Sequence, residues 1–317
     1  MDSIGTPAMW AAFIGFVILM LALDLGVFHR KSHVIGFKEA AIWSGIWVGL
    51  SLIFAGWVFL DFGAVKGTEF LTGYVIEKSL SVDNIFVFVM IFGALGIPAI
   101  YQHRVLFWGI LTALVLRAIM ILAGSAAIER FHWLIYIFGG FLILTGLKMF
   151  FTRNAADSPE DSKLLKWARR LIPSTTRFDG ERFFTRENGR RVATPLFMAL
   201  ILVEFSDVIF AVDSIPAIFA ITTDPFIVFT SNIFAILGLR SLFFMLAGLV
   251  DRFRYLKVGL AAVLVFVGIK MLIMDWYKMP PAVSLAVILG MLGISIWYSL
   301  AVSRKEALAG NANPPSP

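Results

Sequence analysis

Long apolar runs separated by short polar segments dominate the pattern of this 317-residue chain. A helix needs about 20 consecutive, predominantly apolar residues to cross the hydrocarbon core of a bilayer. We therefore predict an all-α, polytopic membrane protein with a single transmembrane domain over residues 1–303. The nine predicted spans are residues 8–28, 40–60, 69–93, 104–125, 132–152, 195–221, 226–250, 256–275 and 281–303.

Composition supports this fold class and excludes several others. Apolar residues make up 59% of the chain and charged residues only 15%, whereas soluble domains are about half apolar and a quarter charged. This excludes an ordinary soluble enzyme, a disordered protein and a nucleic-acid-binding module. The chain has no cysteine, so disulfides, iron–sulfur clusters and thiolate metal sites are excluded as well. We expect the first apolar run to be a true span and not a cleaved signal peptide, because no small-residue cleavage site ends it.

The basic residues predict the orientation in the membrane. Cytoplasmic loops of membrane proteins are enriched in Lys and Arg. With the N-terminus outside, the inner loops hold 19 of the 27 basic residues and the outer loops hold three. We therefore predict an outside N-terminus and a cytoplasmic C-terminus.

The polar segment 153–194 is the predicted cytoplasmic loop. Residues 162–173 have one apolar and one basic side, typical of an interfacial helix on anionic lipid. Alternation around Asn188-Gly189 predicts a β-hairpin within 182–195, with a solvated connector as the alternative. Residues 304–317 are predicted to form a disordered tail.

An internal repeat relates the two halves of the chain. Residues 131–150 align without gaps on 253–272, and the acid-x₅-Asp pattern of 77–83 recurs at 207–213. The repeat units are about 69–152 and 195–275. Because each contains three spans, the second copy runs opposite to the first. Inverted repeats of this kind are a transporter architecture with the substrate site near the membrane midplane.

Acidic residues interrupt the apolar spans, and they mark the candidate site. A charge at the bilayer centre costs about 2.5–3.5 kcal/mol on insertion scales, so it is expected to face the bundle interior or a water-filled cavity. Five of these acids cluster in the first span of each repeat. The acids are Asp24, Glu77, Asp83, Glu204, Asp207 and Asp213.

Spacing predicts how these acids could converge. Glu77 and Asp83 are six residues apart, as are Asp207 and Asp213, which places the members of each pair about 120° apart around a regular helix. A break between them would bring them together. Pro216, which lacks an N–H, predicts such a break in the second repeat.

Two explanations of the acids remain open at this stage. The first is a cation site, and the second is a structural network in which Arg117 and Arg240 each neutralise one carboxylate. For Asp24, near the cytoplasmic end of its span, we favour the structural explanation. The oxygen ligands suit Mn²⁺, Mg²⁺ or Ca²⁺, and a proton-coupled Na⁺ or K⁺ exchanger also fits.

Three segments resemble a known family. EKSLSVDN (77–84) and TPLFMALILVEFSDVIFAVDSIPAIFAIT (194–222) resemble the two signatures of the TerC family of bacterial membrane proteins, and SNIFAILGLRSLFF (231–244) continues the match. The resemblance implies a fold like that of the lysine-exporter superfamily, location in the inner membrane and efflux of Mn²⁺. Its implied metal ligands are Glu77, Asp83, Asn84, Glu204, Asp207, Asp213 and Ser214.

The main functional hypothesis is therefore a secondary transporter, not an enzyme, that exports Mn²⁺ with protons as counter-ion. The alternative is a membrane scaffold that loads metal into exported proteins, with 153–194 as its docking element. An intramembrane aspartyl hydrolase is disfavoured, because the paired aspartates that share a proton in such enzymes lack a glycine-flanked motif here. No P-loop is present, which disfavours ATP-driven pumping. The expected partners are the metal, protons and membrane lipid; no resident cofactor is expected, and the sequence does not predict the oligomeric state.

Overall fold

The computed structural model describes residues 3–26, 35–131, 133–151, 172–187, 189–247, 255–277 and 279–312, and only the backbone of 24–26, 83, 213 and 303–312. The protein is mostly helical, as predicted. The helices are α1 (Pro7–Gly26), α2 (Phe37–Ala94), α3 (Ala99–Arg130), α4 (Leu134–Phe151), α6 (Pro195–Phe219), α7 (Pro225–Leu237), α8 (Leu239–Leu246), α9 (Leu256–Leu272) and α10 (Pro281–Ala312).

Helix α2 consists of two arms that meet at Gly63. A straight helix of its 58 residues would be about 87 Å long, almost three times the thickness of a hydrocarbon core. Gly63 instead adopts φ 84° and ψ 172°, a conformation that is open to glycine because it has no Cβ. The chain folds back there, so that a Cβ on Gly67 would collide with the ring of Phe59. The two arms correspond to the predicted spans 40–60 and 69–93.

Several helices are long and apolar enough to cross a membrane. Within the described residues these are α2, α3, α4, α6 and α10, and α7 with α8 makes a sixth if their 41° bend lies within one span. This count takes α2 as one helix, and it does not confirm nine spans. The apolar part of α1, Pro7–Leu23, is shorter, and α9 has 17 residues.

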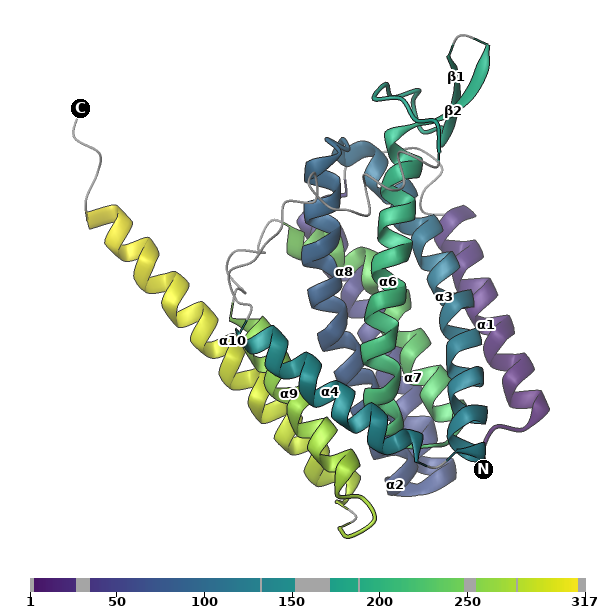
Figure 1. Ribbon diagram of the computed structural model, residues 1–317, viewed down its shortest axis with the longest axis vertical. Coiled ribbons are helices and arrows are strands. Elements are labelled where there is room, and N and C mark those ends of the chain that lie inside the picture. Colours follow the sequence, from purple (N-terminus) through teal and green to yellow (C-terminus); the bar gives the residue numbers. More distant parts are fainter. Residues whose placement is uncertain are drawn as a thin grey trace.

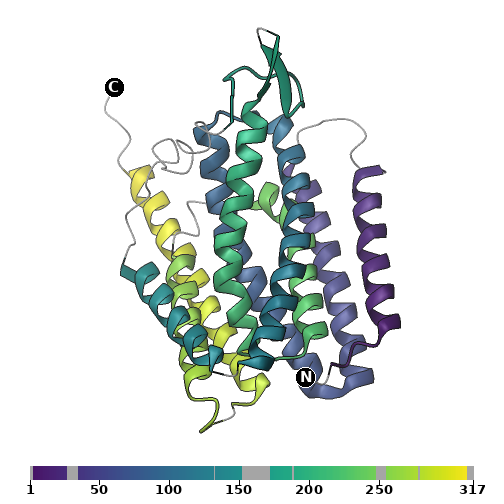
Figure 2. The ribbon, with the colours of Figure 1, turned by 45° about the vertical axis from the view of Figure 1, so that its right-hand side comes forward.

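The helices form two groups that meet at α6 and where α10 contacts α2. Helices α4, α9 and α10 lie together on one side (Figures 1 and 2). Helix α9 packs against both α4 and α10, while α6 contacts α2, α3 and α4. One hydrophobic core fills the larger group, and a second joins the two groups, with residues from α2, α3, α4, α6, α7, α9 and α10.

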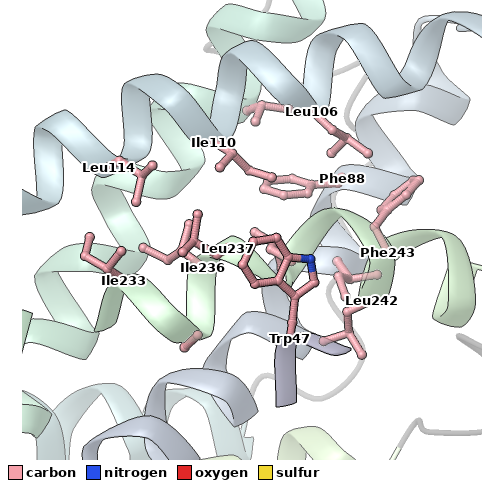
Figure 3. Packing of buried hydrophobic residues seen from close by; sticks show 14 of the residues in the cluster. Trp47, Phe88, Leu106, Ile110, Leu114, Ile233, Ile236, Leu237, Leu242 and Phe243 are labelled. Carbon is pink, nitrogen blue, oxygen red and sulfur yellow. The ribbon is translucent and has the colours of Figure 1, made fainter. Parts of the chain in front are cut away.

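Packing in the larger core involves both arms of α2. Trp47 of the first arm and Phe88 of the second lie with Leu106 of α3 and Phe243 of α8 (Figure 3). Large apolar side chains also cover the outside of the bundle, among them Leu60, which is 87% exposed. Such a surface suits contact with lipid and not with water. The fold is therefore that of a multi-pass membrane protein.

The predicted β-hairpin is present at the end of the molecule opposite the N-terminus (Figure 1). Strands β1 (Phe184–Glu187) and β2 (Arg190–Ala193) pair antiparallel. Gly189 supplies the positive φ of 78° in the turn, as the Asn-Gly signal predicts.

Other predicted features of the polar segments have different outcomes. The amphipathic segment 162–173 lies outside the described residues except for its last two. Helix α10 continues to Ala312, so the prediction of disorder from residue 304 is wrong for 304–312. Residues 313–317 lie outside the described part.

Candidate functional site

A buried ionic cluster lies at the middle of three helices. Glu77 of α2, Arg117 of α3 and Asp207 of α6 are 0%, 1% and 4% exposed. Asp207 lies about 18 Å from either end of α6 at 1.5 Å per residue. Glu77 lies in the middle part of the second arm of α2, which follows Gly63, and Arg117 lies about 20 Å from the end of α3. The cluster is therefore placed near the midplane of any bilayer that these helices cross.

Helical spacing aligns the polar side chains that line this region. On α2, Glu77, Ser81 and Asn84 follow the i, i+4, i+7 pattern of one helix face, and all three are buried. On α6, Asp207 and Ser214 are seven residues apart and share a face in the same way. The repeat places Asp207 at the position of Glu77 and Ser214 at that of Asn84, so the two faces are equivalent.

Arg117 joins the two faces. Its Nη1 atom donates to Glu77 Oε1 and, at 3.1 Å, to Ser214 Oγ. Its Nη2 atom donates to Asp207 Oδ1 at 3.3 Å. One guanidinium thus neutralises acids from both repeats, and two ionised carboxylates with one arginine retain one negative charge.

Glu204 lies one turn before Asp207 and contacts a hydroxyl group in place of an arginine. Its Oε1 atom accepts a hydrogen bond from the Thr112 hydroxyl of α3, and no ion pair to it is found among the described side chains. Gly109 of α3 brings the backbone close, because a Cβ there would lie 3.7 Å from Glu204 Oε1. Glu204 therefore adds negative charge to the same side of the cluster.

Many oxygen atoms in this region have no hydrogen-bond partner. Buried polar atoms are usually paired, so each exception needs an explanation such as a role in binding an ion or a water molecule. The unpaired side-chain oxygens on α2, α6 and α7 include Glu77 Oε2, Ser81 Oγ, Asn84 Oδ1, Glu204 Oε2, Asp207 Oδ2 and Asn232 Oδ1. Hard oxygen donors of this kind are the ligands that Mn²⁺, Mg²⁺ and Ca²⁺ prefer.

The acids that are described do not by themselves complete a metal site. Among the side chains that the structure describes, no three His, Cys, Asp or Glu residues are grouped to hold a metal ion. The side chains of Asp24, Asp83 and Asp213 lie outside that set. Their predicted roles therefore stay predictions.

The predicted helix break is in a different place. Helix α2 is continuous from residue 64 through Asp83, and α6 is continuous through Asp213 and Pro216. The prediction of a break in α6 is therefore wrong. The chain bends instead between α7 and α8 at Gly238, where Lys78 Nζ donates to the Ala235 carbonyl at 3.2 Å.

Arg117 differs from the expectation of one neutralised acid per arginine, because it contacts an acid from each repeat. Arg240 lines a small cavity with Glu39, Trp43 and Trp47. Neutralisation of an intramembrane acid by Arg240 stays a prediction, because the side chains of Asp83 and Asp213 lie outside the described set.

Sequence reasoning missed two polar residues near this region. Thr112 was unremarkable in an apolar run, because serine and threonine occur freely in membrane helices, where they bond to their own backbone. Asn232 is 0% exposed, and neither of its side-chain polar atoms has a partner. An amide within an otherwise apolar helix is costly without a partner, and this signal could have identified Asn232.

Fold and cluster together define a multi-pass integral membrane protein with ionic groups buried in its interior. The model described as "Integral membrane protein TerC family" matches residues 62–307. The chain belongs to the TerC family.

Similar proteins span nearly the full length of the chain. A membrane protein of Myxococcus xanthus named STKORF319 is 70% identical over 302 residues, which is 95% of each chain. A protein of Escherichia coli K12, Alx, whose name describes it as a candidate membrane-bound redox modulator, is 53% identical over 301 residues, 92% of this chain and 94% of its own. A membrane protein of Rickettsia bellii is 44% identical over 291 residues, 92% and 96% of the two chains. No solved structure matches this chain.

Proposed function

We propose that this protein is a secondary transporter that exports Mn²⁺ across the bacterial inner membrane, with protons moving in exchange. The main support is the set of buried, unpaired oxygens on α2, α6 and α7 beside a net negative ionic cluster. Manganese, and the outward direction, follow from what the TerC family is implicated in. The proposed ligands remain Glu77, Asp83, Asn84, Glu204, Asp207, Asp213 and Ser214.

Packing between α4 and α9 supports the inverted repeat that this proposal needs. In the alignment of the repeats, Gly139 is equivalent to Ala261 and Gly146 to Gly268. A Cβ on Gly139 would lie 3.0 Å from the Gly268 carbonyl oxygen, and one on Gly146 would lie 2.8 Å from the Ala261 carbonyl oxygen. Exchange of the two repeats therefore maps one close contact onto the other, as a two-fold axis requires.

The proton coupling rests on the chemistry of the ligands. Carboxylates must be ionised to bind a metal, so metal binding and release are linked to protons. In export driven by inward proton movement, the same carboxylates would bind Mn²⁺ and protons in turn. Nine spans, with the N-terminus outside and the C-terminus inside, remain part of the proposal.

A scaffold that delivers metal to exported proteins is the second candidate. The observation that favours it is the hairpin, where Arg186 and Arg191 pair directly across the strands. Like charges in that position destabilise a sheet and would suit an acidic partner. The name of Alx describes a redox function. Thiol chemistry could not supply such a function in this chain, because it has no cysteine.

The deciding experiment measures Mn²⁺ uptake into everted membrane vesicles. Wild-type protein should accumulate Mn²⁺ when a proton gradient is imposed, and Asp83→Asn and Asp213→Asn should abolish uptake without lowering the melting temperature. Replacing residues 184–193 with a short Gly-Ser linker should leave uptake intact. Uptake that survives both aspartate changes would remove these residues from the site, and wild-type vesicles without uptake would favour the scaffold.

A further inference from the structure

The contacts of Arg117 are incomplete in a specific way. Each carboxylate that it binds offers one oxygen to the guanidinium, while the second oxygen, Glu77 Oε2 or Asp207 Oδ2, has no partner. The Arg117 Nε atom is also unpaired. A buried ion pair stabilises a protein only when further hydrogen bonds satisfy the remaining polar atoms. Arg117 therefore does not complete the network as a permanent structural bridge would.

The net charge of the cluster also indicates that Arg117 is not a permanent structural bridge. Two carboxylates and one guanidinium sum to one negative charge, with Glu204 close by on the same helix face as Asp207. A divalent cation in place of the guanidinium would neutralise Glu77 and Asp207 fully. The same oxygens are thus better matched in charge by a divalent metal ion than by the side chain that occupies them.

We propose that Arg117 is a tethered cation that exchanges with the metal. When no metal is bound, its guanidinium bridges Glu77 and Asp207 and lowers the cost of leaving two carboxylates inside the membrane. When Mn²⁺ binds, the guanidinium withdraws from the carboxylates. This inference rests on the proposed function, and it adds that the Arg117 guanidinium competes with Mn²⁺ for the same carboxylates.

Lys270 of α9 serves as the comparison, because it is also a buried cation, at 7% exposed. It interacts electrostatically with Glu69 of α2, which is not one of the proposed ligands. Removing the charge of Lys270 takes away a buried cation without touching the acids that Arg117 bridges. Its variant therefore separates competition at the site from general damage to the bundle.

The test measures Mn²⁺ binding to purified full-length protein in detergent, from the electron paramagnetic resonance signal of free Mn²⁺, alongside the melting temperature. Arg117→Gln removes the competing charge and should bind Mn²⁺ about tenfold more tightly or better, because a like charge within a few ångströms is lost. Arg117→Lys keeps a tethered charge and should bind no more weakly than wild type. Lys270→Gln should leave the affinity unchanged.

The outcomes separate this inference from the proposed function. An Arg117→Gln protein that melts cooperatively but binds no more tightly than wild type overturns the tethered cation. If that variant does not fold, Arg117→Lys decides: binding more than about tenfold weaker means that the bidentate fork of arginine only positions the acids. Absence of Mn²⁺ binding by wild type would instead overturn the proposed function itself.

Discussion

At the scale of single residues, the described carboxylates differ in the groups that contact them. Glu77 and Asp207 share Arg117, whereas Glu204 accepts a hydrogen bond from Thr112. The loss of a charge should therefore have different consequences at each position. A carboxylate paired with a buried arginine compensates the charge of that arginine, and one held only by a hydroxyl adds repulsion to the cluster.

This difference predicts opposite effects on stability for two matched changes. Glu204→Gln removes an unpaired charge and should reduce Mn²⁺ binding while the melting temperature stays the same or rises. Glu77→Gln weakens one of the two contacts of a buried arginine and leaves Asp207 to neutralise it, so the protein should be destabilised by less than the about 3–5 kcal/mol that breaking a buried pair outright costs. Melting curves and Mn²⁺ titrations on both purified variants check this. Equal destabilisation by the two changes would contradict the assignment of Arg117 to Glu77.

Asp224 is a second residue with several partners. It begins α7, where its Oδ1 accepts from the Phe226 amide at 3.1 Å. It also accepts from Ser3 Oγ at 3.0 Å and the Ile4 amide at 3.1 Å, and pairs with Lys66 Nζ at 3.4 Å. One buried carboxylate thus fixes the N-terminal segment to the α6–α7 connection.

We expect Asp224→Ala to destabilise the protein by about 2–4 kcal/mol, because it removes a helix cap and leaves buried donors unpaired. Ser3→Ala removes only one of the same hydrogen bonds and should cost about 1 kcal/mol or less. Thermal unfolding of the two variants in the same detergent gives the comparison. Similar losses for both would mean that Asp224 does not organise this region.

Features of the site that depend on a single helix were predictable from the sequence, and features that depend on packing between helices were not. The positions of Glu77 and Asp207, and Arg117 as a partner, were predictable because acids and arginines in apolar spans are expensive unless they face the interior. The sharing of one arginine between both repeats was not. It depends on how α3 packs between α2 and α6, which the periodicity of a single helix does not contain.

At the scale of elements, glycines decide which helices approach closely. A Cβ on Gly268 of α9 would lie 2.7 Å from the Gly139 carbonyl oxygen and 2.8 Å from an Ile143 side-chain carbon. A backbone carbonyl cannot move aside to make room for a Cβ in the way that a flexible side chain can. The small residues are therefore required for α4 and α9 to pack, as in other membrane helix pairs.

Gly268→Ala should accordingly lower the free energy of unfolding by about 1–3 kcal/mol through overpacking. Gly140→Ala is the matched control, because nothing lies within 4 Å of a Cβ at Gly140. In a helix, alanine is intrinsically favoured over glycine, so the control should be neutral or stabilising. Melting temperatures of the two variants provide the measurement. A stable Gly268→Ala protein would contradict the close packing of α4 and α9.

Element boundaries were less predictable than element types. The apolar run 226–250 looks continuous, yet α7 ends at Leu237 and α8 begins after Gly238. Both arms of α2 approach this bend, because a Cβ at Gly238 would lie 2.7 Å from Lys78 Nζ and 3.1 Å from Trp47 Cβ. Pro216, the stronger local signal, does not end α6, because a proline in a helix can be accommodated when neighbouring helices support it.

At the scale of the whole molecule, polar groups separate to the two ends of the bundle. The hairpin and the start of α3 lie at one end, joined by the ion pair between Arg104 and Glu181 at 3.1 Å. The N-terminal segment is bound by Asp224 at the other. The helix-rich class and this separation follow from hydropathy and loop charge. The count of nine spans stays a prediction, because the two arms of α2 form one helix in the described structure and α9 has only 17 residues.

The orientation of these two ends gives the last prediction. A truncation after residue 224 fused to alkaline phosphatase, which is active only outside the cytoplasm, should be active, because the outer loops contain three basic residues against 19 inside. A fusion to green fluorescent protein after residue 303 should fluoresce, and so should one after residue 187 in the hairpin. The phosphatase fused at 187 and at 303 should be inactive, and the fluorescence of the fusions at the same two sites shows that truncations there are expressed. Activity of the phosphatase after residue 187 would place the basic hairpin outside the cytoplasm. This result would contradict the predicted orientation of both repeats in the membrane.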